Sequence, residues 1–246
     1  WNAGVLVMTG ANSAAGLRSM PVKTLLLDEV DAFPGDVDGE GDPCALAEAR
    51  TRTFSKRKIF WTSTPTIAGR SRIESEYLAG DMRVYEVPCP HCGCFQPLIW
   101  EQMRWEENKP ETAKYQCVHC EEHIEEHHKN VMLPAGNWVP KNPEGLHKSY
   151  HISSLYSPLG WFNWKEAVFK YLEGLKTDEQ MRVFQNTVLG LPYADQGEAP
   201  DWEILYHRRE EYKMGHVPNE VVFLTCGVDV QKDRLEMEIV GWGREL

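Results

Sequence analysis

Two pairs of cysteines are spaced so that four thiolates could bind one metal ion. Each pair leaves two residues between its members, and the four positions are Cys89, Cys92, Cys117 and Cys120. Two such pairs on tight turns give the donor set of tetrahedral Zn²⁺; a pair of disulfides, the alternative, needs an oxidising compartment, and the sequence has no secretory signs. We therefore expect a zinc ribbon. Such a closed site holds a fold together and leaves no position for a substrate.

Three further donors, His91, Cys94 and His119, lie within or next to these pairs. The four spaced thiolates already fill a tetrahedral site, so we interpret these three as bystanders. Strand-like stretches at residues 83–87 and 95–100 flank the first pair, as a ribbon requires.

Two adjacent carboxylates, Asp28 and Glu29, follow an apolar run at residues 23–27. A short run of this kind suits a buried parallel strand. At the carboxyl end of such a strand, an Asp can hold Mg²⁺ and the next Glu can polarise water at a γ-phosphate, as in a Walker B motif. The same pattern also occurs at ordinary strand ends of α/β proteins, so by itself it leaves the function open.

A second apolar run, residues 58–62, ends in a polar turn. The residues of this turn are Ser63, Thr64, Pro65 and Thr66. In a nucleotide-driven motor such a turn can sense the γ-phosphate; otherwise it is a plain strand-to-loop turn. Between the two runs, Asp42 is a good N-cap and Pro43 a good first residue for a helix continuing over residues 44–54. The order strand, helix, strand predicts a parallel sheet.

A further carboxylate, Asp229, lies in a β-rich run at residues 221–230. An alternating run at residues 235–242 follows, and the two predict a hairpin that opens a new domain. In a two-metal nuclease, one Asp on the first strand of an RNase H-like sheet bridges both ions. The alternative is a turn residue, with Gln231 and Asp233 sharing the turn.

Other elements follow from caps and periodicity. We expect a strand at residues 4–8, an amphipathic helix at 164–175 and a second helix that begins in a capping box of Thr177 and Gln180. The second helix should bury one face and end at residues 189–192. That face carries Met181, Phe184 and Val188. Residues 195–219 read as a polar linker with a short helix at 202–212.

The composition sets limits on partners. The chain has 246 residues and a formal charge of −11, which argues against nucleic acid binding over the whole surface but allows a local basic stripe. Basic residues cluster near the acidic strand, where they could contact DNA phosphates or the nucleotide of a neighbouring subunit, but most of them are more simply a solvated helix face. They are Arg50, Arg52, Lys56, Arg57, Lys58, Arg70 and Arg72. No apolar run has the length of a membrane span, and Cys44 and Cys226 are most simply core residues.

Together these motifs resemble the large terminase subunit of tailed bacteriophages, in the lambda-like group. The resemblance spans nearly the whole chain. It rests on the segments at residues 25–31, 50–54, 63–66, 71–73, 88–93, 184–190 and 227–231. It implies an ATP-driven motor that moves double-stranded DNA into procapsids and a nuclease that cuts the concatemer. It also implies a small terminase subunit and a portal as partners, a homo-oligomer when active, no membrane, and the host cell cytoplasm as location.

The resemblance also implies roles and domains. Asp28 would bind Mg²⁺ with ATP, Glu29 would activate water, the turn at residues 63–66 would be the coupling motif and Asp229 would bind nuclease Mg²⁺. The expected α/β fold has four parts: a partial P-loop-type (ASCE) ATPase sheet, an inserted zinc ribbon, a helical lid or linker, and the first hairpin of an RNase H-like nuclease. Their bounds are residues 1–82, 83–140, 141–217 and 218–246. The Walker A loop and the other nuclease carboxylates are expected outside this sequence, so we expect a fragment that is inactive alone.

Two alternatives stay open at this stage. The acidic strand followed by a Ser/Thr turn also resembles motifs II and III of DExD-type helicases, although nothing in the sequence resembles a second helicase domain. A non-enzymatic zinc-ribbon adaptor for nucleic acid or protein is the other, and it leaves the acidic strand without a purpose.

Overall fold

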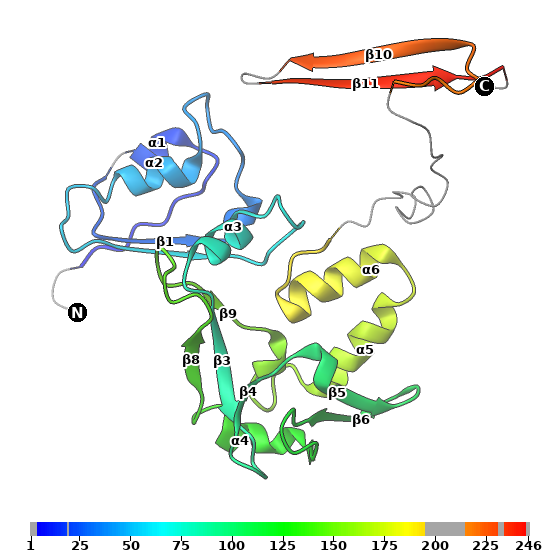
Figure 1. Ribbon diagram of the computed structural model, residues 1–246. Coiled ribbons are helices and arrows are strands. Elements are labelled where there is room, and N and C mark those ends of the chain that lie inside the picture. The colour runs from blue at the N-terminus through cyan, green and yellow to red at the C-terminus, as the bar shows by residue number, and fades with distance from the viewer. Residues whose placement is uncertain (1–3, 19, 195–214, 231–233, 245–246) are drawn as a thin grey trace. The chain divides into compact units, whose positions relative to one another are not determined.

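The computed structural model describes residues 4–18, 20–194, 215–230 and 234–244 of a mixed α/β chain (Figure 1). It divides into two compact units, Trp1–Asp195 and Gln196–Leu246. Each unit is described by itself below. Within the described residues, no helix has both the length and the apolar character that crossing a bilayer requires.

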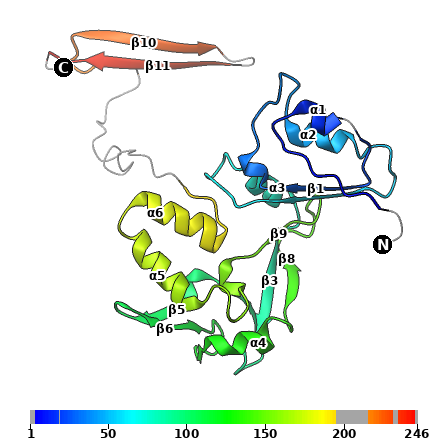
Figure 2. The same cartoon turned by 180° about the vertical axis from the view of Figure 1, so that it is seen from behind.

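A pair of parallel strands forms the first part of unit 1. The elements are α1 (Ala14–Arg18), β1 (Thr24–Asp28), η1 (Val30–Ala32), α2 (Pro43–Ala49), β2 (Lys58–Thr62) and α3 (Arg72–Ala79). β1 and β2 run parallel from Thr24 opposite Lys58 to Asp28 opposite Thr62. This arrangement confirms the strand–helix–strand prediction. The expected burial was wrong, because Leu27 is the one buried residue of β1 and Leu26 and Phe60 are exposed: no described strand or helix covers that face. Figures 1 and 2 show α1 and α2 side by side near β1, and their apolar residues share a small core with Leu27 and Val30.

Helix α2 begins where the sequence predicts but ends earlier. The Asp42 side chain accepts a hydrogen bond from the Ala45 amide at 3.3 Å, and Pro43 occupies the first turn. The helix stops at Ala49 instead of continuing to residue 54. The buried Thr51 hydroxyl donates to the Glu48 carbonyl at 2.8 Å, and such local side-chain bonds favour a turn over further helix.

The strand expected at residues 4–8 does not form, so this prediction was wrong. These residues have no regular structure, and Val5 and Met8 are almost fully exposed. A β-propensity run becomes a strand only when another strand supplies hydrogen-bond partners, and no described strand pairs with it.

The cysteine-bearing part of unit 1 consists of two small sheets. Its elements are β3 (Arg83–Pro88), β4 (Phe95–Pro97), η2 (Trp100–Gln102), β5 (Met103–Glu106), β6 (Lys109–Gln116), β7 (His123–Ile124), η3 (Glu126–His128), α4 (Lys129–Met132), β8 (Asn137–Pro140), β9 (Tyr150–His151) and η4 (Ser154–Tyr156). One sheet has the order β4-β3-β8 with β9 parallel to β3, and the other has the order β5-β6-β7 (Figure 1). β4 is shorter than predicted because the Leu98 amide donates to the Tyr156 hydroxyl at 2.6 Å and not to a strand.

Two helices and a π-helix complete unit 1. They are α5 (Trp164–Gly174), α6 (Asp178–Val183) and η5 (Phe184–Leu189). The Thr177 hydroxyl accepts from the Gln180 amide at 3.2 Å, as predicted. Phe184 and Val188 are buried and Met181 packs against the same core, which confirms the predicted apolar face. Gly190 ends the segment with a φ of 65°, a conformation that favours glycine.

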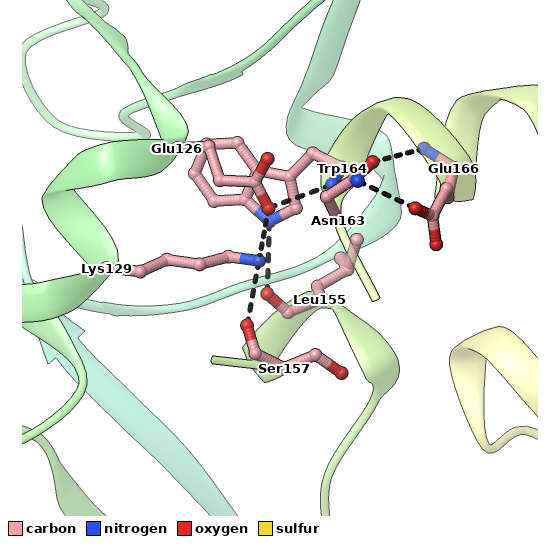
Figure 3. A network of polar contacts seen from close by, with 7 residues as sticks. All are labelled: Glu126, Lys129, Leu155, Ser157, Asn163, Trp164 and Glu166. Carbon is pink, nitrogen blue, oxygen red and sulfur yellow. Dashed lines mark hydrogen bonds and ion pairs between the residues drawn. The ribbon is translucent and has the colours of Figure 1, made fainter. Parts of the chain in front are cut away.

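A polar network around the buried Lys129 joins η3 and α4 to the start of α5 (Figure 3). The Lys129 ammonium is 2.7 Å from a carboxylate oxygen of Glu126 and donates to the Ser157 carbonyl at 3.1 Å, with 1% of its side chain exposed. The same Glu126 oxygen accepts from the Trp164 amide at 2.9 Å. Burial lowers the pKa of Lys129, and Glu126 opposes that effect.

Unit 2 contains the predicted hairpin. β10 (Phe223–Val230) and β11 (Leu235–Trp242) pair antiparallel along their whole length. All their residues are exposed, including Cys226, so the prediction of a buried Cys226 was wrong; Cys44 is buried as predicted. Within the described residues, no other element covers either face of this two-stranded hairpin, so both faces are exposed. The predicted helix at residues 202–212, most of the predicted linker and all but the last residue of the predicted turn at residues 231–234 lie outside the described residues.

Candidate functional site

The two acidic residues after β1 lie beside the polar turn that follows β2. The parallel register places Thr62 opposite Asp28, and the Thr62 hydroxyl donates to Asp28 Oδ1. Glu29 Oε2 accepts from the Ser63 hydroxyl at 3.5 Å and from the Thr64 amide at 3.4 Å. The carboxylates and hydroxyls from both strand ends therefore share one edge of the sheet, an oxygen-rich set of the kind that Mg²⁺ prefers.

The backbone of Glu29 has an uncommon conformation. Its φ of 56° and ψ of 50° lie in the left-handed region, which a residue with a long side chain seldom adopts. The turn directs the chain from β1 into η1 immediately after the carboxylates. Backbone of this kind costs free energy and is concentrated at functional sites.

Asp31 connects the acidic turn to the second strand end, and sequence reasoning assigned it no role. Its Oδ2 accepts from the amide and the hydroxyl of Thr66, both at 3.0 Å, and its Oδ1 accepts from the Ile73 amide at 2.9 Å. Its own amide donates to the Ser63 hydroxyl at 3.1 Å. The sequence signal for Asp31 was its place in the acidic motif of residues 25–31. That motif could not predict its hydrogen-bond partners, because they are more than thirty residues away in sequence.

Arg72 supports the same loop and is not part of a solvated face. Its guanidinium donates to the carbonyls of Val30, Phe33 and Pro34, between 2.8 and 3.3 Å, and pairs with Asp42 at 3.1 Å. A guanidinium presents several donors in a fixed plane, which suits it to hold a loop of carbonyls. Arg50 also binds a carbonyl, that of Arg18. The other basic residues predicted to be a solvated face are exposed: Arg52, Lys56, Arg57, Lys58 and Arg70.

The four spaced cysteines converge as predicted. Their sulfur atoms all lie within 4.8 Å of one another; Cys89 and Cys120 are 3.8 Å apart, and Cys92 and Cys117 are 3.9 Å apart. Four sulfurs about 2.3 Å from a central Zn²⁺ lie about 3.8 Å apart at tetrahedral angles. The donor set and its spacing therefore fit Zn²⁺.

Each cysteine pair lies on a turn with the same hydrogen bonds. The His91 amide donates to Cys89 Sγ and the His119 amide to Cys117 Sγ, both at 3.4 Å. Burial opposes ionisation of Cys117, but hydrogen bonds from the backbone amides of Cys120 and His119 help to lower its pKa to about 6. These amides thus favour the thiolate form of Cys117, which is the form that binds metal.

The three bystander donors are outside the group of four sulfurs. His91 Nε2 is 3.2 Å from the His123 carbonyl and His119 Nε2 is 3.3 Å from the Phe95 carbonyl, so both rings contact the backbone. Cys94 is exposed and does not join the group of four sulfurs.

Asp229 lies on a separate unit from the other carboxylates. It is the seventh residue of β10, directly opposite Glu236 of β11. The strand position contradicts the alternative of a turn residue. Asp229 and Glu236 are the two acidic residues that the register brings together.

Comparisons with known proteins identify the class. Residues 1–138 match the family described as phage terminase large subunit gpA, ATPase domain, and residues 147–246 match terminase large subunit gpA, endonuclease domain. The chain therefore belongs to the gpA family of phage terminase large subunits, as the resemblance implied.

Two relatives agree with this assignment. The terminase large subunit of Enterobacteria phage P21 is 32% identical over 261 residues, and that of Escherichia phage lambda is 29% identical over 262 residues. Each alignment covers 95% of this chain and 40% of the relative, so the chain spans about two fifths of their length. No solved structure shows a significant match. Neither the helicase nor the adaptor alternative is favoured.

Proposed function

We propose that this chain is part of a motor that hydrolyses ATP to move double-stranded DNA into procapsids and cuts the DNA concatemer. The main support is the edge at which Asp28 and Glu29 meet the turn at residues 63–66, in the part of the chain that matches the ATPase family. The relatives are terminase large subunits, which supports the same assignment. A small terminase subunit, a portal with its procapsid and further copies of the motor are the proposed partners, in the host cell cytoplasm.

Each residue at this edge has a proposed role. Asp28 would hold the Mg²⁺ that accompanies ATP, and its contact with Thr62 fixes its orientation. Glu29 would orient the attacking water, and Ser63 and Thr64 hold its carboxylate toward the turn. Mg²⁺ would supply charge neutralisation at the phosphates. The turn at residues 63–66 would couple hydrolysis to movement.

The remaining parts have structural and nuclease roles in this proposal. Residues 1–82 would form part of a P-loop-type ATPase core, residues 83–140 a zinc ribbon held by the four cysteines, and residues 141–217 a helical segment. Residues 218–246 would begin an RNase H-like nuclease, with Asp229 as a ligand of its Mg²⁺. By this proposal the chain alone hydrolyses neither ATP nor DNA, because its sequence contains no Walker A motif and one nuclease carboxylate is not a complete site.

The variant Glu29→Gln tests the ATPase role in a full-length protein that carries this chain. The exchange keeps the size of the side chain but removes its basicity, so ATP hydrolysis should fall by about 10²–10⁴-fold with little change in ATP binding. Phosphate release and nucleotide binding are measured side by side. Glu106→Gln is the control, since Glu106 pairs with the exposed Lys109. Equal hydrolysis in both variants would remove Glu29 from the mechanism.

The variant Asp229→Asn tests the nuclease role. Removal of one metal-bridging carboxylate should abolish plasmid cleavage in the same full-length protein, while ATP hydrolysis stays close to the unmodified level. Loss of ATP hydrolysis with retained cleavage would reverse the assignment.

A further inference from the structure

The coupling turn contacts a segment that is far away in sequence. The Thr66 carbonyl accepts from the Asn186 side-chain amide at 2.8 Å and from the Tyr193 backbone amide at 2.9 Å. All three residues lie in unit 1. Thr66 belongs to the ATPase family match, whereas Asn186 and Tyr193 belong to the endonuclease family match. The contact therefore joins the two family segments at the proposed coupling motif.

Further hydrogen bonds make this contact a short ladder. The Ala68 amide donates to the Tyr193 carbonyl at 2.9 Å, and Ile67 pairs with Tyr193 as a parallel bridge. Asn186 Nδ2 also donates to the Leu191 carbonyl at 2.9 Å, so one side-chain amide binds both sides of the contact. An amide that bridges two carbonyls fixes their separation.

Asn186 lies in the π-helix η5. π-helical turns are rare and occur often at functional sites. The Thr187 hydroxyl donates to the Val183 carbonyl at 2.7 Å within the same turn. The left-handed Gly190 then reverses the chain, and a Cβ there would lie 3.2 Å from the Ile152 carbonyl oxygen.

The other end of η5 is anchored in the large core. The Phe184 ring lies 4.8 Å from Trp100 and 5.4 Å from Tyr171, measured between ring centroids, and 3% of Phe184 is exposed. A close-packed aromatic cluster of this kind deforms little. Asn186 is therefore two residues from a rigid anchor.

Thr66 is held from the opposite side by the acidic turn. Its amide and hydroxyl both donate to Asp31, two residues after Glu29. Thr66 thus connects the proposed catalytic edge, through its amide and hydroxyl, to Asn186, through its carbonyl. A displacement of the acidic turn therefore changes the hydrogen bond to Asn186, and a displacement of Asn186 changes the hydrogen bonds to Asp31.

We propose that Asn186 is a positioning residue that carries displacement of the coupling motif into η5 and the aromatic core around Phe184. This inference rests on the proposed function, because it assumes that the turn at residues 63–66 moves during hydrolysis and names η5 as the element that receives the movement. The side-chain amide of Asn186 donates to the carbonyls of Thr66 and Leu191, and its role is therefore placed in coupling and not in hydrolysis itself. Its effect is on the movement obtained from each ATP.

The variant Asn186→Asp tests this role in the full-length protein. The carboxylate has the same shape but faces two carbonyls without a proton to donate, so the contact is lost. DNA packaged per ATP hydrolysed should fall about tenfold, a typical coupling between sites, and should fall more than ATP hydrolysis does. Asn142→Asp is the matched control, because the Asn142 amide also donates to a carbonyl, that of Gly80, at 3.2 Å.

Loss of the contact between Asn186 and Thr66 can also be measured directly on this chain, without a packaging assay. Hydrogen exchange at the Ala68 and Tyr193 amides should accelerate in Asn186→Asp and stay unchanged in Asn142→Asp. If Asn186→Asp lowers the melting temperature strongly, Asn186→Ala removes the same amide without adding charge and should show the same loss of DNA per ATP.

The outcomes are distinguishable. An equal ratio of DNA to ATP in the variants of Asn186 and Asn142 overturns this inference, while a loss of hydrolysis in Glu29→Gln leaves the proposed function standing. Unchanged hydrolysis in Glu29→Gln overturns the proposed function instead.

Discussion

The cysteine-bearing sheets and the β1–β2 pair use their polar contacts differently. Around the cysteines, four sulfurs and the Lys129–Glu126 pair connect elements next to a large buried core. At the end of the β1–β2 pair, hydrogen bonds converge on Asp31 and on Thr66, which is exposed, beside a much smaller core. In the proposed function, the first set of contacts would stabilise the fold, whereas the second set would position groups for ATP hydrolysis.

Metal removal should produce the largest effect in this comparison. Cys117→Ser should release one Zn²⁺ per chain and unfold the cysteine-bearing sheets, because structural zinc contributes on the order of 10 kcal/mol to such modules. Metal content and circular dichroism measure the result. Cys94→Ser is the control, since Cys94 is outside the group of four sulfurs. A Cys117→Ser protein that is metal-free and fully folded would contradict the zinc ribbon.

Loss of the buried ion pair should have an intermediate effect. Lys129→Ala should lower the free energy of unfolding by about 3 kcal/mol, because it leaves the Glu126 carboxylate without its cation. It also removes the side chain whose ammonium lies over the Trp164 ring. Lys170→Ala is the matched control: Lys170 pairs with Glu173 at the same sequence spacing, but its side chain is 53% exposed. That control should cost less than about 0.5 kcal/mol. Equal losses of unfolding free energy in the two variants, measured by urea unfolding, would show that the burial of Lys129 adds nothing to the stability contributed by its ion pair.

Loss of Asp31 should have the smallest effect on stability and yet reduce activity. Asp31→Ala removes three hydrogen bonds and should cost about 2 kcal/mol in unfolding free energy, while ATP hydrolysis by the full-length protein falls. Asp36→Ala is the control, because the Asp36 carboxylate accepts hydrogen bonds only from nearby amides of its own loop, those of Gly39 and Gly41, in the contacts that the structure shows. Equal hydrolysis in the two variants would show that the contacts of Asp31 serve stability alone.

Local sequence signals predicted much of the fold. The caps at Asp42 and Thr177, the strand Lys58–Thr62 and the hairpin were predicted because their causes lie within a few residues. The predicted strand at residues 4–8 failed for the opposite reason, since a strand depends on a distant partner. Burial of Cys226 failed likewise, because no described element covers the hairpin.

The family itself was evident from the order of the motifs, and the convergence of the four cysteines followed from their spacing. Tertiary structure alone decided that Asp31 and Asn186 meet at Thr66, across 35 and 120 residues of sequence. It also decided that Lys129 is buried and that Arg72 binds a loop of carbonyls instead of solvent. Short-range patterns encode turns, caps and the buried face of an element. Which polar groups meet across the fold depends on how the elements pack, and packing is a property of the whole chain.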